Sequence, residues 1–295
     1  MPSKLRDTLV TALTPTSWGT TYIVTTELLP HDRPFLAATL RALPAGLVLL
    51  AYGRVLPRGQ WWWKAGVLGA LNIGLFFALL FVSAERLPGG VAATLGAIGP
   101  LVVAVLSWPV LGLRPAARTL LAGVIGLVGV ALLVLTPRAS LDGVGVLAGI
   151  AATGSMALGI VLTKRWGRPA PLVAFTGWQL TAGGIVLLPI LLGAEGLPAS
   201  VTGSQVGGFA YLAFGNTALA YVLWFRGIER LPASAVSFLA LLSPIVATVI
   251  GYFALDQSLS ALQLGGMVLA AVGLVGGQLA ATGGWPRLPL RRRGA

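Results

Sequence analysis

Long apolar runs, separated by short segments rich in proline and polar residues, follow one another along the whole chain. Each run is close to the roughly 20 residues that an α-helix needs to cross a membrane. The pattern therefore predicts an all-α polytopic membrane protein. We expect ten transmembrane helices, at residues 9–28, 34–53, 65–83, 89–111, 119–136, 143–163, 172–192, 207–225, 233–253 and 261–281.

Composition supports this prediction and narrows the function. Charged residues make up 9% of the 295 residues, against about 25% in an ordinary soluble domain. These charges are too few for the polar shell of a soluble protein, which excludes a soluble enzyme and a nucleic-acid-binding protein. The chain has no cysteine and one histidine, so we expect no cofactor, no metal site and no thiol chemistry.

Lysine and arginine residues indicate the orientation, because cytoplasmic loops of membrane proteins carry an excess of them. They fall mainly at the two termini and in every second loop, whereas Arg33, Arg86 and Arg138 fall on the opposite side. We therefore expect both termini in the cytoplasm. The same distribution accounts for the net charge of +12 without an anionic partner.

An internal repeat divides the chain. The segment Glu-Arg-Leu-Pro at 85–88 recurs at 229–232, an offset of 144 residues. The same offset relates three further pairs, which are Asn72 and Asn216, Pro100 and Pro244, and Gly129 and Gly273. Earlier in each half the offset is 138 residues. We expect two five-helix repeats, residues 1–138 and 139–295, within one membrane domain.

Because five is odd, the second repeat must lie inverted in the membrane relative to the first. Inverted repeats are typical of carriers that alternate between two open states, with the substrate site between the repeats near the middle of the membrane. Duplication kept for packing alone is the alternative. One chain already contains both repeats, which favours a monomer.

Several motifs together resemble a known family. They are Pro15-x-x-Trp18-Gly19 in the first span, Arg41 in the second, the two Glu-Arg-Leu-Pro segments, and the mid-helix Pro100 and Pro244. In this order, with ten spans, they resemble the EamA branch of the drug/metabolite transporter superfamily over nearly the whole chain. Within that family the chain looks most like the YddG-type aromatic amino acid exporters.

The resemblance implies a fold in which spans one to four and six to nine surround a central cavity, while spans five and ten brace the outside. It also implies export of small metabolites across the bacterial inner membrane. The implied partners are the lipid bilayer and a small-molecule substrate.

Polar groups at the depth of a membrane are costly, so each of them is a candidate for substrate binding. The amides of Asn72 and Asn216 suit the carboxylate and ammonium groups of an amino acid, or they hold helices together; the sequence leaves both readings open. Aromatic rings that face a cavity would stack on an aromatic substrate or hold a cation. The candidate substrate-binding residues are Trp18, Tyr22, Asn72, Thr94, Met156, Asn216, Tyr221 and Ser237.

Other residues are expected to have structural roles. Pro100 and Pro244 each remove a backbone hydrogen bond in mid-span and are predicted gating hinges; static kinks are the alternative. We expect Arg41 to snorkel or to pair with helix-end carbonyls, rather than to neutralise a substrate carboxylate. For Phe76, Phe77 and Trp224, a core or lipid-facing position is favoured, and the cavity-facing alternative stays open. Glycines spaced for close helix contact are assigned to the packing of spans five and ten, namely Gly123, Gly126, Gly129, Gly273 and Gly277.

The energy source is constrained by what the spans lack. No acidic residue lies near the centre of a predicted span, and there is no Walker A motif. We therefore expect facilitated export that is driven by the substrate gradient. The alternatives are weak coupling through a residue at the end of a span, such as Glu27, and proton-coupled antiport. A membrane enzyme would need a catalytic group set, and a channel would need a selectivity filter; neither is recognisable.

The prediction is an inner-membrane exporter, not an enzyme, for small amphipathic metabolites. Aromatic and other large neutral amino acids are the favoured substrates, and cationic or neutral drugs and dyes are the alternative class.

Overall fold

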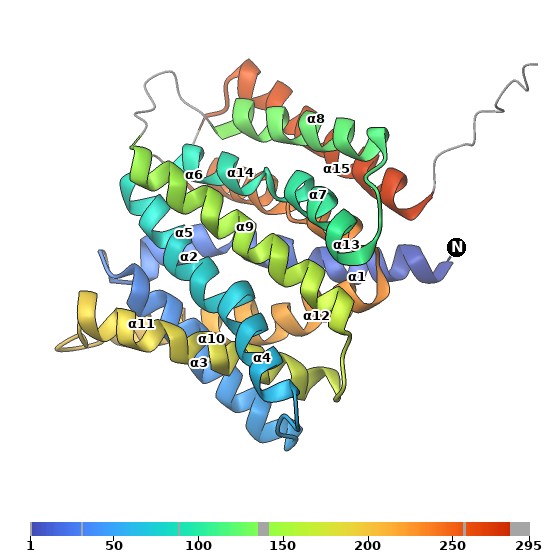
Figure 1. Ribbon diagram of the computed structural model, residues 1–295. Coiled ribbons are helices and arrows are strands. Elements are labelled where there is room, and N and C mark those ends of the chain that lie inside the picture. Colours follow the sequence, from blue (N-terminus) through green and yellow to red (C-terminus); the bar gives the residue numbers. More distant parts are fainter. Residues whose placement is uncertain (1, 31, 88, 135–141, 256–257, 284–295) are drawn as a thin grey trace, which may run out of the picture.

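The computed structural model describes residues 2–30, 32–87, 89–134, 142–255 and 258–283. Within these residues every regular element is a helix (Figure 1). The elements are α1 (Pro2–Gly19), α2 (Thr21–Leu28), α3 (Pro34–Gly53), α4 (Trp61–Gly69), η1 (Ala70–Gly74), α5 (Leu75–Arg86), α6 (Gly89–Gly96), α7 (Gly99–Leu111), α8 (Ala117–Val134), α9 (Gly143–Trp166), α10 (Leu172–Ala194), α11 (Gly203–Ala210), η2 (Tyr211–Leu219), α12 (Ala220–Arg230), α13 (Ala233–Leu239), α14 (Leu242–Ala254) and α15 (Ala261–Thr282).

Nine helical stretches in the described part of the chain are long and apolar enough to cross a membrane. They correspond to the second to tenth predicted spans. The predicted first span, 9–28, is divided at Thr20 into α1 and α2, and α1 carries Lys4, Arg6 and Asp7 in its first turns. The described residues therefore form a helical protein with nine stretches that are candidates for crossing a membrane.

The helices form a bundle with a closely packed pair at each of two opposite edges. At one edge α8 packs along α15, and at the other α3 packs along α10 (Figure 1). The carboxylate of Glu195, which follows α10, accepts hydrogen bonds from the backbone N–H groups of Phe35 and Leu36 in the first turn of α3, at 2.6 and 2.9 Å. This contact satisfies two N–H groups that the helix itself leaves unpaired.

Small residues bring α8 and α15 into backbone contact. A Cβ atom placed on Gly129 would lie 2.2 Å from the backbone nitrogen of Ala270, and one on Gly273 would lie 2.4 Å from Gly126. The assignment of these glycines to the packing of spans five and ten is confirmed. Gly123 and Gly277 pack elsewhere, against Leu101 and Phe238.

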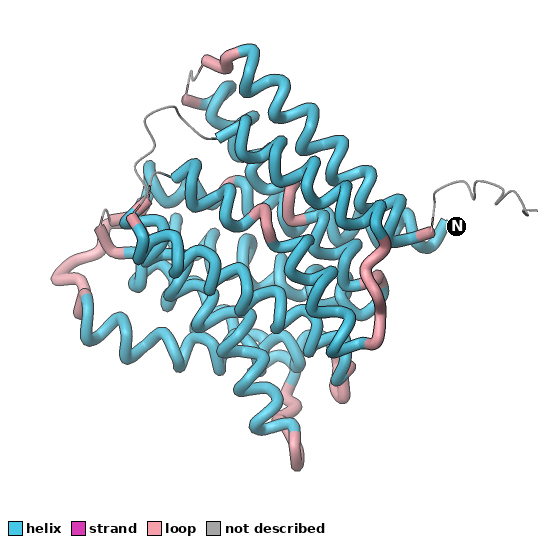
Figure 2. The backbone as a smooth tube through the Cα atoms, turned by 45° about the horizontal axis from the view of Figure 1, so that its top comes forward, coloured by secondary structure: helices cyan, strands magenta, loops and turns pink. Residues whose placement is uncertain are grey.

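Irregular helix geometry is concentrated in the middle of four spans. The chain is π-helical in η1 and η2, which contain Asn72 and Asn216. Two other helices are interrupted, at 97–98 between α6 and α7 and at 240–241 between α13 and α14 (Figure 2). Such irregular turns inside otherwise continuous helices are frequent at functional sites.

Gly129→Ala tests the packing of the α8–α15 pair. The added methyl group overlaps the backbone of α15, so we expect a loss of stability of about 1–3 kcal/mol, measured as a lower melting temperature in detergent. Gly265→Ala on the same helix pair is the matched control, because no atom lies within 4 Å of its added Cβ. Equal melting temperatures for the two variants would contradict the packing described.

Candidate functional site

A cavity of about 600 Å³ lies inside the helical bundle. Small-molecule sites occupy about 300–1,000 Å³, so the volume suits a metabolite. Residues from α1, α2, α3, α5, α6, α7, α9, α12, α13 and α14 line it. Among the described residues, α8 and α15 contribute none, as the resemblance implied. The seventh span, α10, also contributes none, which corrects the expectation that all of spans six to nine line the cavity.

The cavity opens at one end of the bundle and is closed at the other. Asp32 and Ala84 line its mouth and are exposed. On α9 the lining residues run from Gly149 to Ile160, whereas Lys164, near the end of the same helix, lies beyond the cavity. The lining therefore ends before the positively charged end of α9.

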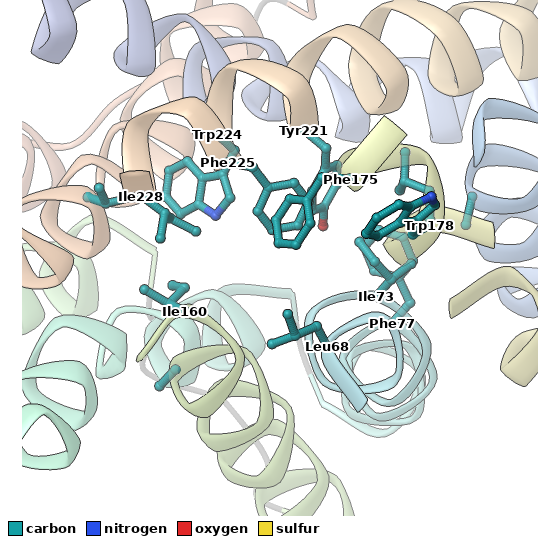
Figure 3. Close-up of a cluster of buried hydrophobic side chains, with 14 of the residues drawn as sticks. Leu68, Ile73, Phe77, Ile160, Phe175, Trp178, Tyr221, Trp224, Phe225 and Ile228 are labelled. Atoms are coloured by element: carbon teal, nitrogen blue, oxygen red, sulfur yellow. The ribbon is translucent and has the colours of Figure 1, made fainter. Parts of the chain in front are cut away.

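Aromatic side chains form the floor of the cavity. The ring of Trp18 lies 5.3 Å from that of Tyr221 and 5.0 Å from that of Trp224, between centroids. Phe225 continues this layer at 5.8 Å from Tyr221. Figure 3 shows these side chains of α12 facing Ile160 of α9. Tyr221 and Trp224 line the cavity but are each 1% exposed, so this layer is tightly packed.

The structure brings six of the ten sequence-predicted residues to the cavity wall, which are Trp18, Pro100, Met156, Tyr221, Ser237 and Pro244. Asn72, Thr94 and Asn216 are not wall residues. Tyr22 lies in α2, but its side chain is outside the described part of the structure. The hydroxyl of Ser237 donates to the carbonyl oxygen of Ser234 in its own helix.

Three aromatic residues that the sequence left as core or lipid-facing also line the cavity. They are Phe76, Phe77 and Trp224. The repeat carried a signal for one of them, because Phe77 lies 144 residues before Tyr221. For Phe76 and Trp224, hydropathy gave no indication of the side that each ring faces.

Asn72 lies in a buried network of side-chain hydrogen bonds between helices. Its side-chain nitrogen donates to Gln179 Oε1 at 2.9 Å and to Thr163 Oγ1 at 3.3 Å. Its amide lies against Gly159, where a Cβ atom would come within 2.2 Å of Oδ1. Asn72 and Gln179 are at most 1% exposed. These contacts have the character of interhelical packing.

Asn216 occupies the equivalent position and joins four elements. Its Oδ1 accepts hydrogen bonds from Arg41 Nη2 at 2.6 Å and from Thr21 Oγ1 at 3.1 Å. Its Nδ2 donates to the carbonyl oxygen of Ser17 at 2.6 Å. Its own carbonyl oxygen accepts from Trp18 Nε1 at 3.2 Å. Asn216 thus holds three wall residues, Trp18, Thr21 and Arg41, without lining the cavity itself.

Arg41 lines the cavity and is 6% exposed. Its Nε donates to Thr217 Oγ1 at 2.9 Å, and its guanidinium carbon lies 4.8 Å from the centroid of the Phe77 ring. The expectation that Arg41 snorkels or pairs with helix-end carbonyls is wrong, because side chains of η2 hold it at the cavity.

Both predicted hinge prolines follow a break in their helix. Pro100 is the second residue of α7 and Pro244 is the third of α14, and both line the cavity. The turns before them contain short-range hydrogen bonds, such as Ile98 N–H to Leu95 O and Leu241 N–H to Phe238 O. Whether these breaks act as hinges stays a prediction.

Charged side chains tie the helices together at the closed end. The ammonium group of Lys164 donates to the carbonyl oxygens of Ile228, Glu229 and Leu231, at 2.8–2.9 Å. Arg168 binds both carboxylate oxygens of Glu229, at 3.0 and 3.1 Å. The last carbonyl groups of α12 have no hydrogen-bond donor within their own helix. Lys164 supplies both the donor and a positive charge at this helix end. We call these contacts the α9–α12 latch.

The model of the EamA-like transporter family matches residues 8–135 and 143–276. The chain belongs to this family.

Curated relatives agree with the family assignment. Protein PecM of Dickeya dadantii (strain 3937) is 48% identical over 88% of both chains. An uncharacterized inner membrane transporter of Escherichia coli (strain K12), YedA, is 27% identical over 86% of both chains. A crystal structure with 22% sequence identity superposes with a TM-score of 0.77 and covers 94% of this chain and 97% of its own; it supports the fold.

The site of this EamA-family protein is a cavity that can hold a small molecule. Its wall is mainly aromatic and small apolar side chains, with few polar groups. In the described part of the chain, no three His, Cys, Asp or Glu side chains gather as a metal site. The family is one of transporters, and the relative YedA is described as an inner membrane transporter.

Lys164→Met tests the α9–α12 latch. The variant keeps the side-chain length but removes three hydrogen bonds, so we expect the closed end to open about fivefold more often. The chain has no native cysteine, so Met156→Cys in the cavity wall serves as a reporter for a membrane-impermeant maleimide. Labelling through the mouth should slow, and labelling from the latch side should appear.

Arg118→Met is the matched control, since Arg118 is an exposed cation on α8, away from the cavity. We expect it to label as the parent reporter does. Identical labelling of the Lys164→Met, Arg118→Met and parent proteins would show that the latch does not hold the end closed.

Proposed function

We propose that this EamA-family protein is an alternating-access carrier that exports small amphipathic metabolites across the bacterial inner membrane. The supporting observation is the cavity itself, which is of metabolite size, opens at one end only, and is walled by helices from both halves of the chain. A carrier needs a site that is reached from one side at a time. The α9–α12 latch and the aromatic floor supply the closed side.

The inverted 5+5 arrangement, with repeats 1–138 and 139–295 and ten spans, is part of this proposal. Features 144 residues apart support it: a π-helical segment around Asn72 and Asn216, and a helix break before Pro100 and Pro244. Alternate bending at the two breaks would open one face at a time. With both termini in the cytoplasm, the mouth described here faces outward.

Aromatic and other large neutral amino acids are the proposed substrates, as in the YddG-type exporters that the sequence resembles. Trp18 and Phe76 line the cavity and are only partly buried, so their rings offer surface on which an aromatic side chain can stack. The same rings would attract a cation, so a cationic drug or dye is the second candidate.

Counterflow in proteoliposomes tests the carrier and its substrate. With unlabelled tryptophan inside, at equal pH and zero membrane potential, we expect labelled tryptophan to accumulate transiently. Trp18→Ala should slow this uptake about tenfold, because burying an aromatic side chain against a ligand contributes about 1.5–3 kcal/mol.

Trp108→Ala is the matched control, since Trp108 is 53% exposed on α7 and outside the cavity wall; we expect unchanged uptake. Absence of accumulation with tryptophan, phenylalanine and threonine would remove the amino acid assignment. Equal slowing by the two tryptophan variants would contradict the placement of the site.

Facilitated export is the proposed energy mode. Asp32, at the mouth, is the one acidic wall residue in the described part of the cavity, and proton-coupled carriers use carboxylates at membrane depth. We therefore expect a pH gradient imposed on liposomes with equal tryptophan on both sides to drive no net uptake. Uphill accumulation would establish proton-coupled antiport instead.

A further inference from the structure

Arg41 is a buried cation without a counter-charge. The four ion pairs in the described part of the chain all involve other residues. Its hydrogen-bond partners, Thr217 and Asn216, are neutral. Among the described residues no acceptor is bonded to its remaining nitrogen, Nη1. A desolvated guanidinium group without a counter-ion is unfavourable, so its presence in a cavity wall needs a physical reason.

The rest of the wall does not neutralise this charge. Asp32 and Arg33 are adjacent at the mouth and carry opposite charges. Arg41 lies eight residues further along α3, about 12 Å deeper at the rise of an α-helix. The interior of the cavity therefore carries one net positive charge in its described wall, beside the ring of Phe77.

The internal repeat shows that packing does not require this charge. At the offset of 138 residues, Arg41 corresponds to Gln179. Gln179 makes the equivalent contact in the opposite direction, because its Oε1 accepts a hydrogen bond from Asn72 at 2.9 Å. In one pair of equivalent positions, the neutral amide of Gln179 joins the seventh span to Asn72 of the third. In the other pair, the guanidinium of Arg41 joins the second span to Asn216 of the eighth. Gln179 is away from the cavity, whereas Arg41 lines it.

We propose that Arg41 is the anion-binding residue of the carrier and that its substrates are recognised by a carboxylate. The inference rests on the proposed function of the cavity as a substrate site. The guanidinium donates to the carboxylate through Nη1, while Asn216 and Thr217 hold Nη2 and Nε in place. The aromatic body of the substrate lies against Trp18 and Tyr221.

The proposal makes the carboxylate, rather than the ammonium group, the recognised feature. No carboxylate side chain lies at depth in the described wall to bind an ammonium group. Aromatic acids without an amino group therefore bind, and aromatic amines without a carboxylate are repelled by Arg41. This selectivity disfavours cationic drugs and dyes, even though the aromatic floor alone would accept them.

The test compares ligands that share a ring but differ in charge. Tryptophan, indole-3-propionate and tryptamine are titrated against the full-length protein in detergent, with the shift in melting temperature as readout, and 4-methylpentanoate serves as an acid without an aromatic ring. We expect both indole acids to stabilise the wild-type protein and tryptamine to bind at least about tenfold more weakly, the loss typical of a charged hydrogen bond.

Arg41→Gln removes the positive charge and introduces the residue that the second repeat has at the equivalent position, Gln179. We expect the acids to bind about 10- to 100-fold more weakly to it, with tryptamine unchanged or improved. Arg41→Lys keeps the charge and should retain the preference for acids. Arg118→Gln is the matched control, since it removes an equal charge from the exposed face of α8, away from the cavity wall, and should leave the affinities within about twofold.

Three results would overturn the proposal. They are equal binding of tryptamine and the acids to the wild-type protein, an acid preference that survives Arg41→Gln, and no binding of any carboxylate.

Other results would distinguish failure of the proposed carrier function from failure of the proposed anion site. Arg41-dependent binding of acids without tryptophan counterflow would leave the anion site and remove the carrier. Counterflow that tryptamine inhibits as strongly as indole-3-propionate would leave the carrier and remove the anion site. Binding of 4-methylpentanoate alone would keep Arg41 but exclude aromatic substrates.

Discussion

The amide of Asn216 holds the cavity wall together. Its side chain accepts hydrogen bonds from Arg41 and Thr21 and donates to the backbone of Ser17, while its carbonyl oxygen receives the indole N–H of Trp18. Leaving a buried amide unpaired costs about 1–3 kcal/mol per group, so losing any one of these contacts would weaken the others that share the same amide. One residue thereby positions both the cation of the wall and the edge of its aromatic floor.

The two halves use equivalent residues for different purposes. Asn72 is surrounded by Gln179, Thr163 and Gly159 and makes only interhelical contacts. Asn216 instead faces a guanidinium group. The difference follows from one substitution between the repeats, because a glutamine can satisfy an amide without adding charge, whereas an arginine brings a charge that only water or an anion can offset.

Much of the fold follows from the sequence, and the reason is the membrane. Every backbone polar group in a bilayer must be satisfied within its own helix, so continuous apolar runs locate the nine long helical stretches in the described part of the chain. The first predicted span shows the limit of this argument, since its polar first turns and the break at Thr20 set α1 and α2 apart. Gly126, Gly129 and Gly273 were assigned correctly to the contact between α8 and α15, because a missing side chain leaves few other roles at that spacing.

Hydropathy by itself determined that the chain crosses a membrane and where its helices lie, and the internal offsets marked equivalent positions such as Asn72 and Asn216. It did not determine which side chains face the cavity. Lipid, protein core and an aromatic cavity wall all accept the same apolar residues, so Phe76 and Trp224 carried no directional signal. Only the packing of distant helices brought α3 beside η2, and that contact turned Arg41 from an expected snorkelling residue into the charged centre of the site.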